Sequence, residues 1–326
     1  MARATYPNGF PNGIVLRGVP IVQTHPGKTF WVSNNTTGLL AGQGGGSDGN
    51  KGTFDRPFAT LAYAITQCVA NRGDIIFIKP GHAETITANT ALPFNVAGVA
   101  IVGLGAGSSR PTFTFTTANT NRIPVSAANI SIQNCVFIGN FLSIATCFLL
   151  TTAPEFTVDN CAFRDTSAVL GFLSIVTTTV SVNADGLTFT NNEVYSDATT
   201  TPGPAVVIAG TIARLTVSDN YVVHSTASNN VAALIAHGAL VVSGLRCERN
   251  LIFSVNTDTA TGGILLTTSA TTGSGIIAGN RIRTLDTVAA ILVTATAVQY
   301  GLFDNLHTGD GNASGLLLPV AANDAA

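Results

Sequence analysis

Three short stretches hold the residue types that glycoside-cleaving enzymes use. Hydrolysis of a glycosidic bond needs two carboxylates that flank the bond, one as general acid and the other as base or nucleophile. The candidates are Asn256-Thr257-Asp258, Ala236-His237-Gly238 and Arg281-Ile282-Arg283. The His stretch precedes the Asp stretch, the reverse of the order in hydrolases of the polygalacturonase type, and no Asp-Asp pair is present. We expect loop residues and a solvated basic strand here, and no catalytic residue.

Other site chemistries lack their residue patterns as well. A calcium-dependent lyase would need a cluster of acids with an Arg base, whereas the 17 carboxylates are scattered, although neighbouring segments could still bring some together. The loop from Ser47 to Gly52 resembles a calcium loop only superficially, because it contains Lys51 and has Ala59 where the twelfth, acidic position would be. The five histidines show no metal-ligand spacing, and no phosphate-binding glycine loop opens a helix. We expect no metal, no cofactor and no enzymatic activity.

Aromatic residues, which supply stacking platforms in sugar-binding grooves, are few. The chain has one Trp and five Tyr, and only Tyr195, Tyr221 and Tyr300 of these lie after residue 75. We therefore expect little capacity to hold a polysaccharide. A run of aromatics or facing carboxylates on one outer face would favour the opposite interpretation.

The 326-residue chain is poor in charge, with 10% charged residues against 46% hydrophobic ones. Either Thr, Ser and Asn cover much of the outside or a large part is buried against other chains. The net charge of −2 gives no electrostatic case for binding nucleic acid or an anionic membrane. The sequence shows no uniformly apolar membrane span and no export signal. Five cysteines, an odd number, are typical of reduced thiols. Cys135 and Cys161 could form a disulfide, but we expect both to be free thiols.

An eight-residue pattern recurs along the chain. Its first and third positions are usually apolar and its second is usually polar, which predicts a β-strand. Clear copies begin at residues 130, 156, 187, 215, 245, 275 and 300, and weaker copies begin at 75 and 99. A period that varies between 24 and 31 residues is typical of a solenoid with loops of different length.

Two columns of residues support this interpretation. Asparagine holds the sixth position in five copies, which predicts a ladder of amides at a tight bend, and cysteine holds it in two others. The asparagines are Asn192, Asn220, Asn250, Asn280 and Asn305. A second apolar column, 17 to 20 residues after each start, comprises Phe148, Leu173, Val207, Leu234, Leu265, Leu292 and Leu317. Together they predict an all-β fold, a right-handed parallel β-helix of about nine coils.

The ends of such a stack need caps. Asp55 as N-cap, Pro57 in the first turn and apolar residues at helical spacing predict a capping helix over residues 57–72, ended by Gly73. We therefore expect an extended docking arm over 1–33, a Gly-rich loop and capping helix over 34–73, and the β-helix over 74–326. Residues 308–326, with Leu316-Leu317-Leu318-Pro319, are expected to close the last coil.

The segment from Gly52 to His82, which contains Gly-Thr-Phe-Asp-Arg-Pro-Phe and Gly-Asp-Ile-Ile-Phe-Ile-Lys-Pro-Gly-His, resembles the opening of many phage and secreted β-helix proteins. The chain as a whole is similar to a group of tailed-bacteriophage virion proteins, generally labelled as head decoration (cement) or structural proteins. This resemblance implies a virion role and supplies no catalytic residues.

From these observations we expect a structural protein that decorates and reinforces a tailed-phage capsid, assembled in the host cytoplasm and located on the capsid surface. The alternative is a tail fibre or tailspike component that binds or cleaves host polysaccharide. A β-helix with so few charged residues would expose a large apolar patch as a monomer. We therefore expect a homotrimer that buries one long face of each copy. Contact with the major capsid protein is expected through the aromatic and Arg residues of the arm, which are Arg3, Tyr6, Phe10, Arg17, Phe30 and Trp31.

Overall fold

The computed structural model describes most of the chain from residue 27 onward. The described residues are 14–16, 19–21, 27–37, 39, 42–180, 183–197, 203–225, 233–237, 241–255, 264–266, 273–284, 291–293, 298–309 and 315–317. Apart from one α-helix and one short 3₁₀ turn, the regular structure in these residues is β-strand.

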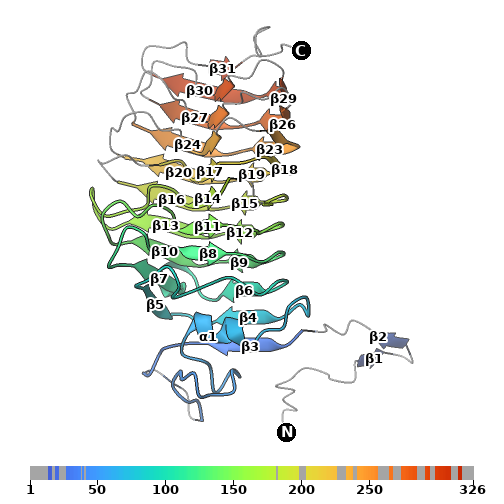
Figure 1. The fold of residues 1–326 in the computed structure, drawn as a ribbon, viewed down its shortest axis with the longest axis vertical. Helices are drawn as coiled ribbons and strands as arrows, with labels where there is room; N and C mark the ends of the chain where they lie inside the picture. Colours follow the sequence, from blue (N-terminus) through green and yellow to red (C-terminus); the bar gives the residue numbers. More distant parts are fainter. Residues whose placement is uncertain are drawn as a thin grey trace.

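Three long sheets form a parallel β-helix, so the predicted all-β fold class is confirmed (Figure 1). Each coil runs through one strand of sheet 1, bends sharply into sheet 2 and passes through a longer loop into sheet 3. Sheet 1 contains β3 (Thr29–Val32), β4 (Ile75–Ile78), β6 (Ala100–Gly103), β9 (Ser131–Gln133), β12 (Thr157–Asp159), β15 (Thr188–Thr190), β19 (Thr216–Ser218), β23 (Leu245–Glu248), β26 (Gly273–Ala278) and β29 (Val298–Phe303).

Sheet 2 also has ten strands and sheet 3 has seven. Sheet 2 contains β5 (Ala83–Ile86), β7 (Thr112–Phe115), β10 (Val136–Gly139), β13 (Ala162–Asp165), β16 (Glu193–Ser196), β20 (Tyr221–His224), β24 (Leu251–Ser254), β27 (Arg281–Thr284), β30 (Asn305–Gly309) and β31 (Gly315–Leu317). Sheet 3 contains β8 (Ile123–Val125), β11 (Phe148–Leu150), β14 (Val176–Thr178), β17 (Val206–Ile208), β21 (Ile235–His237), β25 (Ile264–Leu266) and β28 (Ile291–Val293). The small elements are β1 (Ile14–Leu16) with β2 (Val19–Ile21), β18 (Ile212–Ala213) with β22 (Val242–Ser243), and the 3₁₀ turn η1 (Gly107–Ser109).

The core is a column of apolar side chains inside the coils. Phe137 stacks between Phe113 and Phe163, with ring centroids 5.5 and 5.2 Å apart, and Phe148 of sheet 3 meets Phe137 edge-on at 5.1 Å. These residues come from successive coils because the parallel register places Phe113, Phe137 and Phe163 opposite one another. Each coil thus buries its inner residues against its neighbours, as the repeat predicts.

In the described residues seven coils supply a strand to all three sheets, fewer than the nine or so expected. At one end the coil of β4 and β5 reaches sheet 3 through a single bridge between Phe94 and Val125, and at the other no sheet 3 strand follows β29 and β30 within the described residues. The strand pattern itself begins earlier than expected. Thr29–Val32 pairs in parallel with β4, so the first rung of sheet 1 comes from residues that we assigned to the arm.

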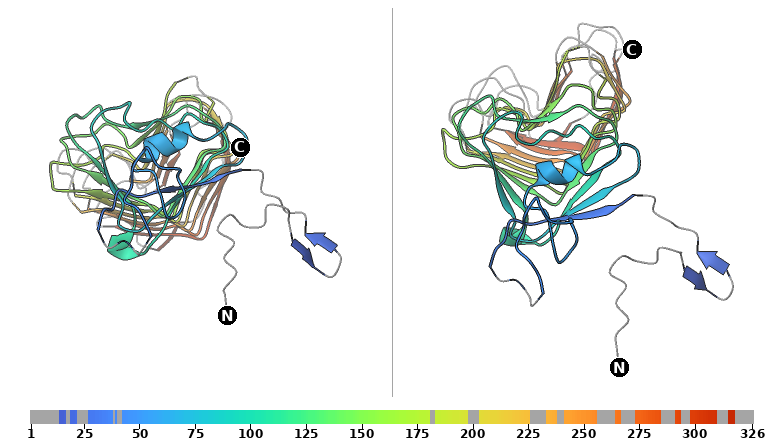
Figure 2. Two further views of the ribbon diagram at one scale, coloured as in Figure 1. Left: turned by 90° about the horizontal axis from the view of Figure 1, so that it is seen from below. Right: turned by 60° about the horizontal axis from the view of Figure 1, so that its bottom comes forward.

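The expected helix over residues 57–72 is wrong in its bounds. Helix α1 spans Leu61–Thr66, and its N-cap is Thr60, whose side chain accepts a hydrogen bond from the backbone N–H of Tyr63. Phe58 is extended instead, because it bridges Val32 and exchanges backbone hydrogen bonds with Trp31 and Ser33. The helix buries Leu61, Ala64 and Ile65 and lies across the end of the stack, as a cap should (Figure 2).

The Asp74 carboxylate links two segments of the chain at this end of the stack. This carboxylate, fully buried, accepts hydrogen bonds from the backbone N–H groups of Lys28 (2.6 Å) and Val69 (2.8 Å) and pairs with the Arg72 guanidinium at 2.6 Å. Burial by itself would raise the pKa of Asp74, but the hydrogen bonds from Arg72, Val69 and Lys28 outweigh it and hold the pKa below its usual value. The carboxylate therefore ties the strand entering β3 to the segment that follows α1.

Most residues that we assigned to the second apolar column do not occupy the inward positions of the sheet 3 strands. They lie one to three residues away from those positions in the sequence. Phe148 is opposite Val176, and Val206 is opposite Ile235, so Leu173, Val207 and Leu234 are not the strand-pairing core residues of that column. The cause is that loops of different length precede each sheet 3 strand. At the C-terminal end β31 pairs antiparallel with β30, and residues 318–326 of the expected cap lie outside the described residues. No helix in the described part is long and apolar enough to cross a membrane.

Candidate functional site

The asparagine column forms a continuous hydrogen-bonded ladder inside the bend between sheets 1 and 2. The Oδ1 atom of each asparagine accepts a hydrogen bond from the backbone N–H one coil earlier, at 2.9–3.1 Å. Each Nδ2 group donates to a sheet 1 carbonyl of the preceding coil, at 2.8–3.0 Å. The members Asn192, Asn220, Asn250, Asn280 and Asn305 are all buried. Their role in this arrangement is to satisfy backbone groups at the bend.

The residue before each ladder position has a left-handed backbone conformation, which lets the chain turn within two residues. Its φ is 55° at Asn191, 58° at Asp219, 54° at Arg249 and 46° at Asp304, and Gly279 takes the same role at 65°. Asn and Asp tolerate this region better than most residues. Upstream, Cys135 and Cys161 take the ladder position as free thiols, and the Sγ atom of Cys161 lies 3.8 Å from the carbonyl oxygen of Ile132.

The outer face of sheet 2 carries the chemically richest exposed side chains of the described stack. Two outward columns run along it, one beginning at Glu193 and the other at Arg164. The first column contains Glu193, Tyr221, Leu251, Arg281 and Leu306, and the second contains Arg164, Tyr195, Val223, Phe253 and Arg283. We call this set the sheet 2 face.

Three aromatic rings follow one another on the sheet 2 face. Tyr195 meets Tyr221 at 5.6 Å between ring centroids, and Tyr221 meets Phe253 at 5.9 Å, both edge-to-face. The Arg164 guanidinium lies 5.8 Å from the Tyr195 ring centroid. Burial, Glu193 and Tyr221 together raise the pKa of Tyr195. This run corrects the expectation that the chain has few aromatic platforms: Tyr300 is buried and donates to the Val242 carbonyl, but Phe253 joins the other two tyrosines.

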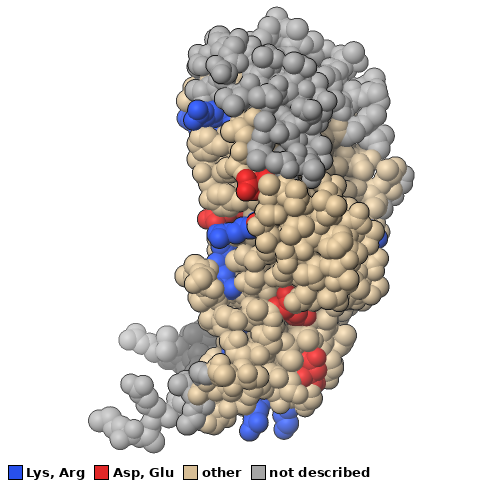
Figure 3. All heavy atoms as spheres, turned by 90° about the vertical axis from the view of Figure 1, so that its left-hand side faces the viewer, with Lys and Arg blue, Asp and Glu red and all other residues tan. Residues whose placement is uncertain are grey.

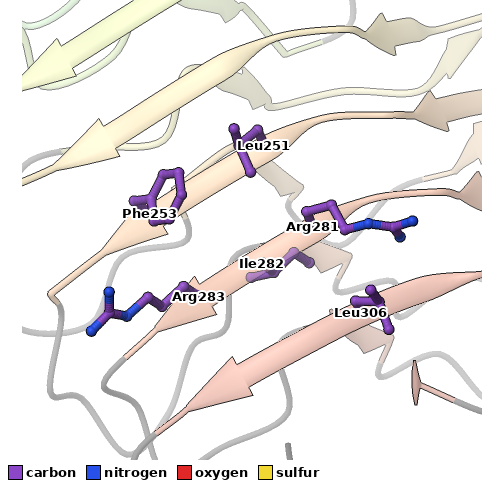
Figure 4. A pocket seen from close by; sticks show the side chains of 6 residues that line it. All are labelled: Leu251, Phe253, Arg281, Ile282, Arg283 and Leu306. Atoms are coloured by element: carbon purple, nitrogen blue, oxygen red, sulfur yellow. The ribbon is translucent and has the colours of Figure 1, made fainter. Parts of the chain in front are cut away.

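Two adjoining cavities open beside Phe253. One, of about 190 Å³, is lined by Leu251, Phe253, Arg281, Ile282, Arg283 and Leu306 (Figure 4). The other, of about 300 Å³, is lined by Val223, His224, Ser225, Phe253, Ser254, Val255 and Arg283. Phe253 and Arg283 border both, so we treat the two cavities as one groove, the Phe253 groove. In Figure 4 the two guanidinium groups point away from each other, toward opposite ends of the first cavity.

The groove's polar groups are cationic or neutral. Arg281 donates to the backbone carbonyl of Asp304 at 2.9 Å and lies 3.6 Å from its carboxylate. His224 is buried, its Nε2 atom has no hydrogen-bond partner among the described residues, and burial lowers the pKa of its imidazole to about 4. The imidazole is therefore neutral at neutral pH. Elsewhere on this side of the molecule charged residues are sparse (Figure 3).

The expected capsid-contact residues divide into two groups. Arg3, Tyr6, Phe10 and Arg17 lie outside the described residues. Phe30 and Trp31 belong to β3, so assigning them to an extended arm is wrong: Phe30 is buried against Phe58, because inward positions of the first rung need apolar cover.

Trp31 lies outside the core in an aromatic cluster with Phe54 and Phe77. The ring centroids are 4.9 and 5.0 Å apart, and the Lys79 ammonium sits 4.1 Å from the Phe54 centroid. Phe54 is 47% exposed. We call Trp31, Phe54, Phe77 and Lys79 the end cluster.

Of the stretches considered for glycoside hydrolysis, the two that the structure describes lie on different sheets. His237 is buried at the end of a sheet 3 strand, while Arg281 and Arg283 are on the sheet 2 face; Asn256 and Asp258 lie outside the described residues. In the described ranges no three His, Cys, Asp or Glu side chains are grouped to hold a metal ion. Asp48, in the loop that resembles a calcium site, instead accepts hydrogen bonds from the backbone N–H groups of Ala59 and Thr60, at 2.9 and 3.0 Å.

One close acid–base pair does occur, between His82 and Glu84. The Nε2 atom of His82 lies 3.2 Å from a Glu84 carboxylate oxygen, and its Nδ1 atom accepts the backbone N–H of Asn34 at 3.1 Å. The Nδ1 contact assigns the proton to Nε2, which donates to Glu84. The same carboxylate oxygen accepts the backbone N–H of Leu61 at 3.1 Å. Both side chains are thus engaged in fixing α1 and the first coils.

Comparison with known proteins finds similar solved structures of low sequence identity. No protein-family model matches the chain, and no curated protein does. Solved structures similar to it include a rhamnogalacturonan lyase, with 13% identity over 86% of this chain and 87% of that chain and a TM-score of 0.42. A GH136 lacto-N-biosidase from Eubacterium ramulus has 12% identity over 84% and 68% and a TM-score of 0.30, and ORF18 of Geobacillus virus E2 has 11% identity over 76% and 57% and a TM-score of 0.31.

Proposed function

We propose that this chain is a non-catalytic structural protein of a tailed-bacteriophage virion that decorates and reinforces the capsid. The observation that carries the proposal is the continuous, internally bonded stack: two ten-stranded sheets joined at a bend by a buried amide ladder. Such a stack is a stiff rod whose described surface shows no assembled catalytic group. The sequence resemblance to phage virion proteins supports the same role.

Attachment to the capsid is proposed to involve the N-terminal segment together with the end cluster. The end cluster exposes the aromatic ring of Phe54, and aromatic residues are enriched in protein interfaces. It joins the first two rungs of sheet 1, and its Trp31 follows the N-terminal segment closely in the chain. The chain would then stand on the capsid by its capped end.

The proposed assembly is a homotrimer. The described surface is poor in charge, and closed threefold symmetry would cover one long face of each copy. A trimer would also match the threefold sites between neighbouring capsomers in a capsid lattice.

The test is binding of the purified chain to phage heads that lack it. Deleting residues 1–26 leaves β3 intact, and we expect this variant to keep its oligomeric state in light scattering but to bind heads at least tenfold more weakly. Phe54→Ser tests the end cluster, and Val180→Ser is the matched control, since both side chains are exposed and apolar. Full decoration by the deletion variant, or fewer than a few dozen copies per virion, would contradict the proposal.

A second function is favoured by the sheet 2 face. Its aromatic run is the feature that we expected of a protein that binds polysaccharide, such as a tail fibre or tailspike component. Among the members of the sheet 2 face Glu193 alone carries a carboxylate, so binding rather than cleavage is the form of this alternative that we propose. Copy number separates the two roles, because decoration requires hundreds of copies per virion and a tail position about a dozen.

A further inference from the structure

The Phe253 groove has the composition of a ligand site. Its floor and walls are apolar, with Leu251 and Phe253 on β24 and Leu306 two rungs away on β30, and a few polar groups converge on it from the edges. Specific ligand sites commonly combine an apolar lining with a small number of placed polar groups. From this arrangement we propose that the Phe253 groove binds an acidic polysaccharide, with the sugar rings against Phe253 and a sugar carboxylate on Arg283.

The charge of the lining supports an anionic ligand. The residues that line the two cavities include two arginines and no carboxylate. Arg281 is held by Asp304, whereas no hydrogen bond or ion pair engages Arg283 within the described residues. Asp197 lines neither cavity, and it accepts a hydrogen bond from Ser225 at the second one. A guanidinium group binds a carboxylate through two parallel hydrogen bonds, so Arg283 is suited to that role.

The neutral groups of the groove suit a sugar. A pyranose ring presents a face of C–H groups that packs on an aromatic ring, and hydroxyl groups at its rim that need hydrogen-bond partners. Phe253 supplies the ring. Ser225, Ser254 and His224 supply polar atoms at the second cavity, and the Nε2 atom of His224 is buried with no partner among the described residues. Tyr221 and Tyr195 continue the aromatic run along the stack, so an extended chain could lie across several rungs.

Other occupants fit the groove less well. The central strands of sheet 2 are paired on both sides, so a peptide cannot add to them as a further strand. Nucleic acid is disfavoured by the net charge of −2 and by the small number of cations on this face. A second copy of the chain remains the competing occupant, and the experiment below includes it. The proposal specifies the second candidate function and does not depend on capsid decoration.

The probe is the hexasaccharide of α-1,4-linked galacturonic acid, with its carboxyl-reduced form as the neutral control, titrated into the full chain by calorimetry. We expect weak binding of the acidic probe that declines as salt is added, and at least tenfold weaker binding of the neutral one. Arg283→Gln and Phe253→Leu should each weaken binding of the acidic probe about tenfold, as expected for the loss of one charge-assisted contact or one stacking ring. Arg246→Gln is the matched control, because Arg246 is exposed on sheet 1 in the same coil.

Equal binding of the two hexasaccharides, or no effect of either groove variant, would overturn the proposal. Sedimentation of the same variants tests whether a second copy of the chain occupies the groove. If Phe253→Leu or Arg283→Gln disrupts an oligomer that Arg246→Gln preserves, the groove is an interface between copies and the proposal is wrong. Head binding by the groove variants is measured in parallel. Normal decoration without saccharide binding would refute the groove proposal alone, and saccharide binding without decoration would refute only the capsid role.

Discussion

Replacement of Asn250 by Leu should destabilise the stack strongly, because four hydrogen bonds with nitrogen and oxygen partners converge on this buried side chain, besides a contact with the Cys247 sulfur. Its Oδ1 atom accepts from the backbone N–H and the Nδ2 group of Asn220, at 3.1 and 2.9 Å. Its Nδ2 group donates to the carbonyl of Val217 and to Oδ1 of Asn280, both at 2.9 Å. Leucine is similar in length and can make none of these bonds.

The magnitude follows from what the substitution leaves unpaired. In the variant the Nδ2 group of Asn220 still donates one hydrogen bond to the carbonyl of Phe189. The backbone N–H of residue 250 still donates to Oδ1 of Asn280. The backbone N–H and the other amide hydrogen of Asn220 lose their acceptor, and each buried unpaired donor costs about 1–3 kcal/mol. Burial of the leucine side chain returns about 1–2 kcal/mol. We expect a net loss of about 3 kcal/mol in the free energy of unfolding.

Urea unfolding followed by circular dichroism measures this loss. The matched control is Asn119→Leu, because Asn119 is exposed and makes no side-chain hydrogen bond within the described residues. We expect the midpoint of Asn250→Leu to fall clearly below that of the parent and the midpoint of Asn119→Leu to stay near it. Identical midpoints for the two variants would show that the ladder contributes nothing, and the argument from unpaired donors would be refuted.

Three further predictions concern the interior of the coils. Cys161→Asn should raise stability by about 1 kcal/mol, since an amide can donate to the Ile132 carbonyl that the thiol now meets at 3.8 Å; a lower unfolding midpoint would contradict this. Acid should destabilise the fold through His224: its pKa falls from 6.5 to about 4 on folding, so the stability present above pH 6.5 declines by about 3 kcal/mol on the way to pH 4, and an equal decline in His224→Gln would exclude this imidazole as the cause. Iodoacetamide should leave the native thiols unmodified at pH 8, since burial raises the pKa of Cys135 and Cys147 well above the usual value, and rapid labelling without unfolding would show that the coils open.

The sequence was sufficient to predict the coils because the repeat is carried by backbone requirements. An asparagine at the bend recurs in five consecutive copies, and alternating apolar residues recur in their strands, so Asn192 to Asn305 could be aligned without a structure. The position of Thr29–Val32 could not be found this way, because Thr29 precedes its partner Ile75 by 46 residues, outside the period of 24 to 31. The helix start was missed because Phe58 pairs with β3, a contact between segments that no local capping signal reports.

The candidate site was harder to predict for a related reason. Tyr195 and Phe253 both occupy the ninth position of their repeats, directly after the eight-residue pattern. Extending the alternation by one residue would have placed them in one outward column together with Arg164 and Arg283. What periodicity cannot supply is the depth of the Phe253 groove, since this depends on the side chains of three different coils. The sequence predicts which residues point outward, but only the three-dimensional structure shows which of them enclose a cavity.

The ladder also fixes the order in which the chain can fold. Every asparagine of the ladder bonds to backbone groups of the coil made just before it, 25 to 34 residues earlier in the chain. Each new coil in turn supplies the Oδ1 acceptor for the bend N–H of the coil before it, and the capped first rung emerges first. The stack can therefore wind from its N-terminal end during translation, each new coil using the previous one as its template.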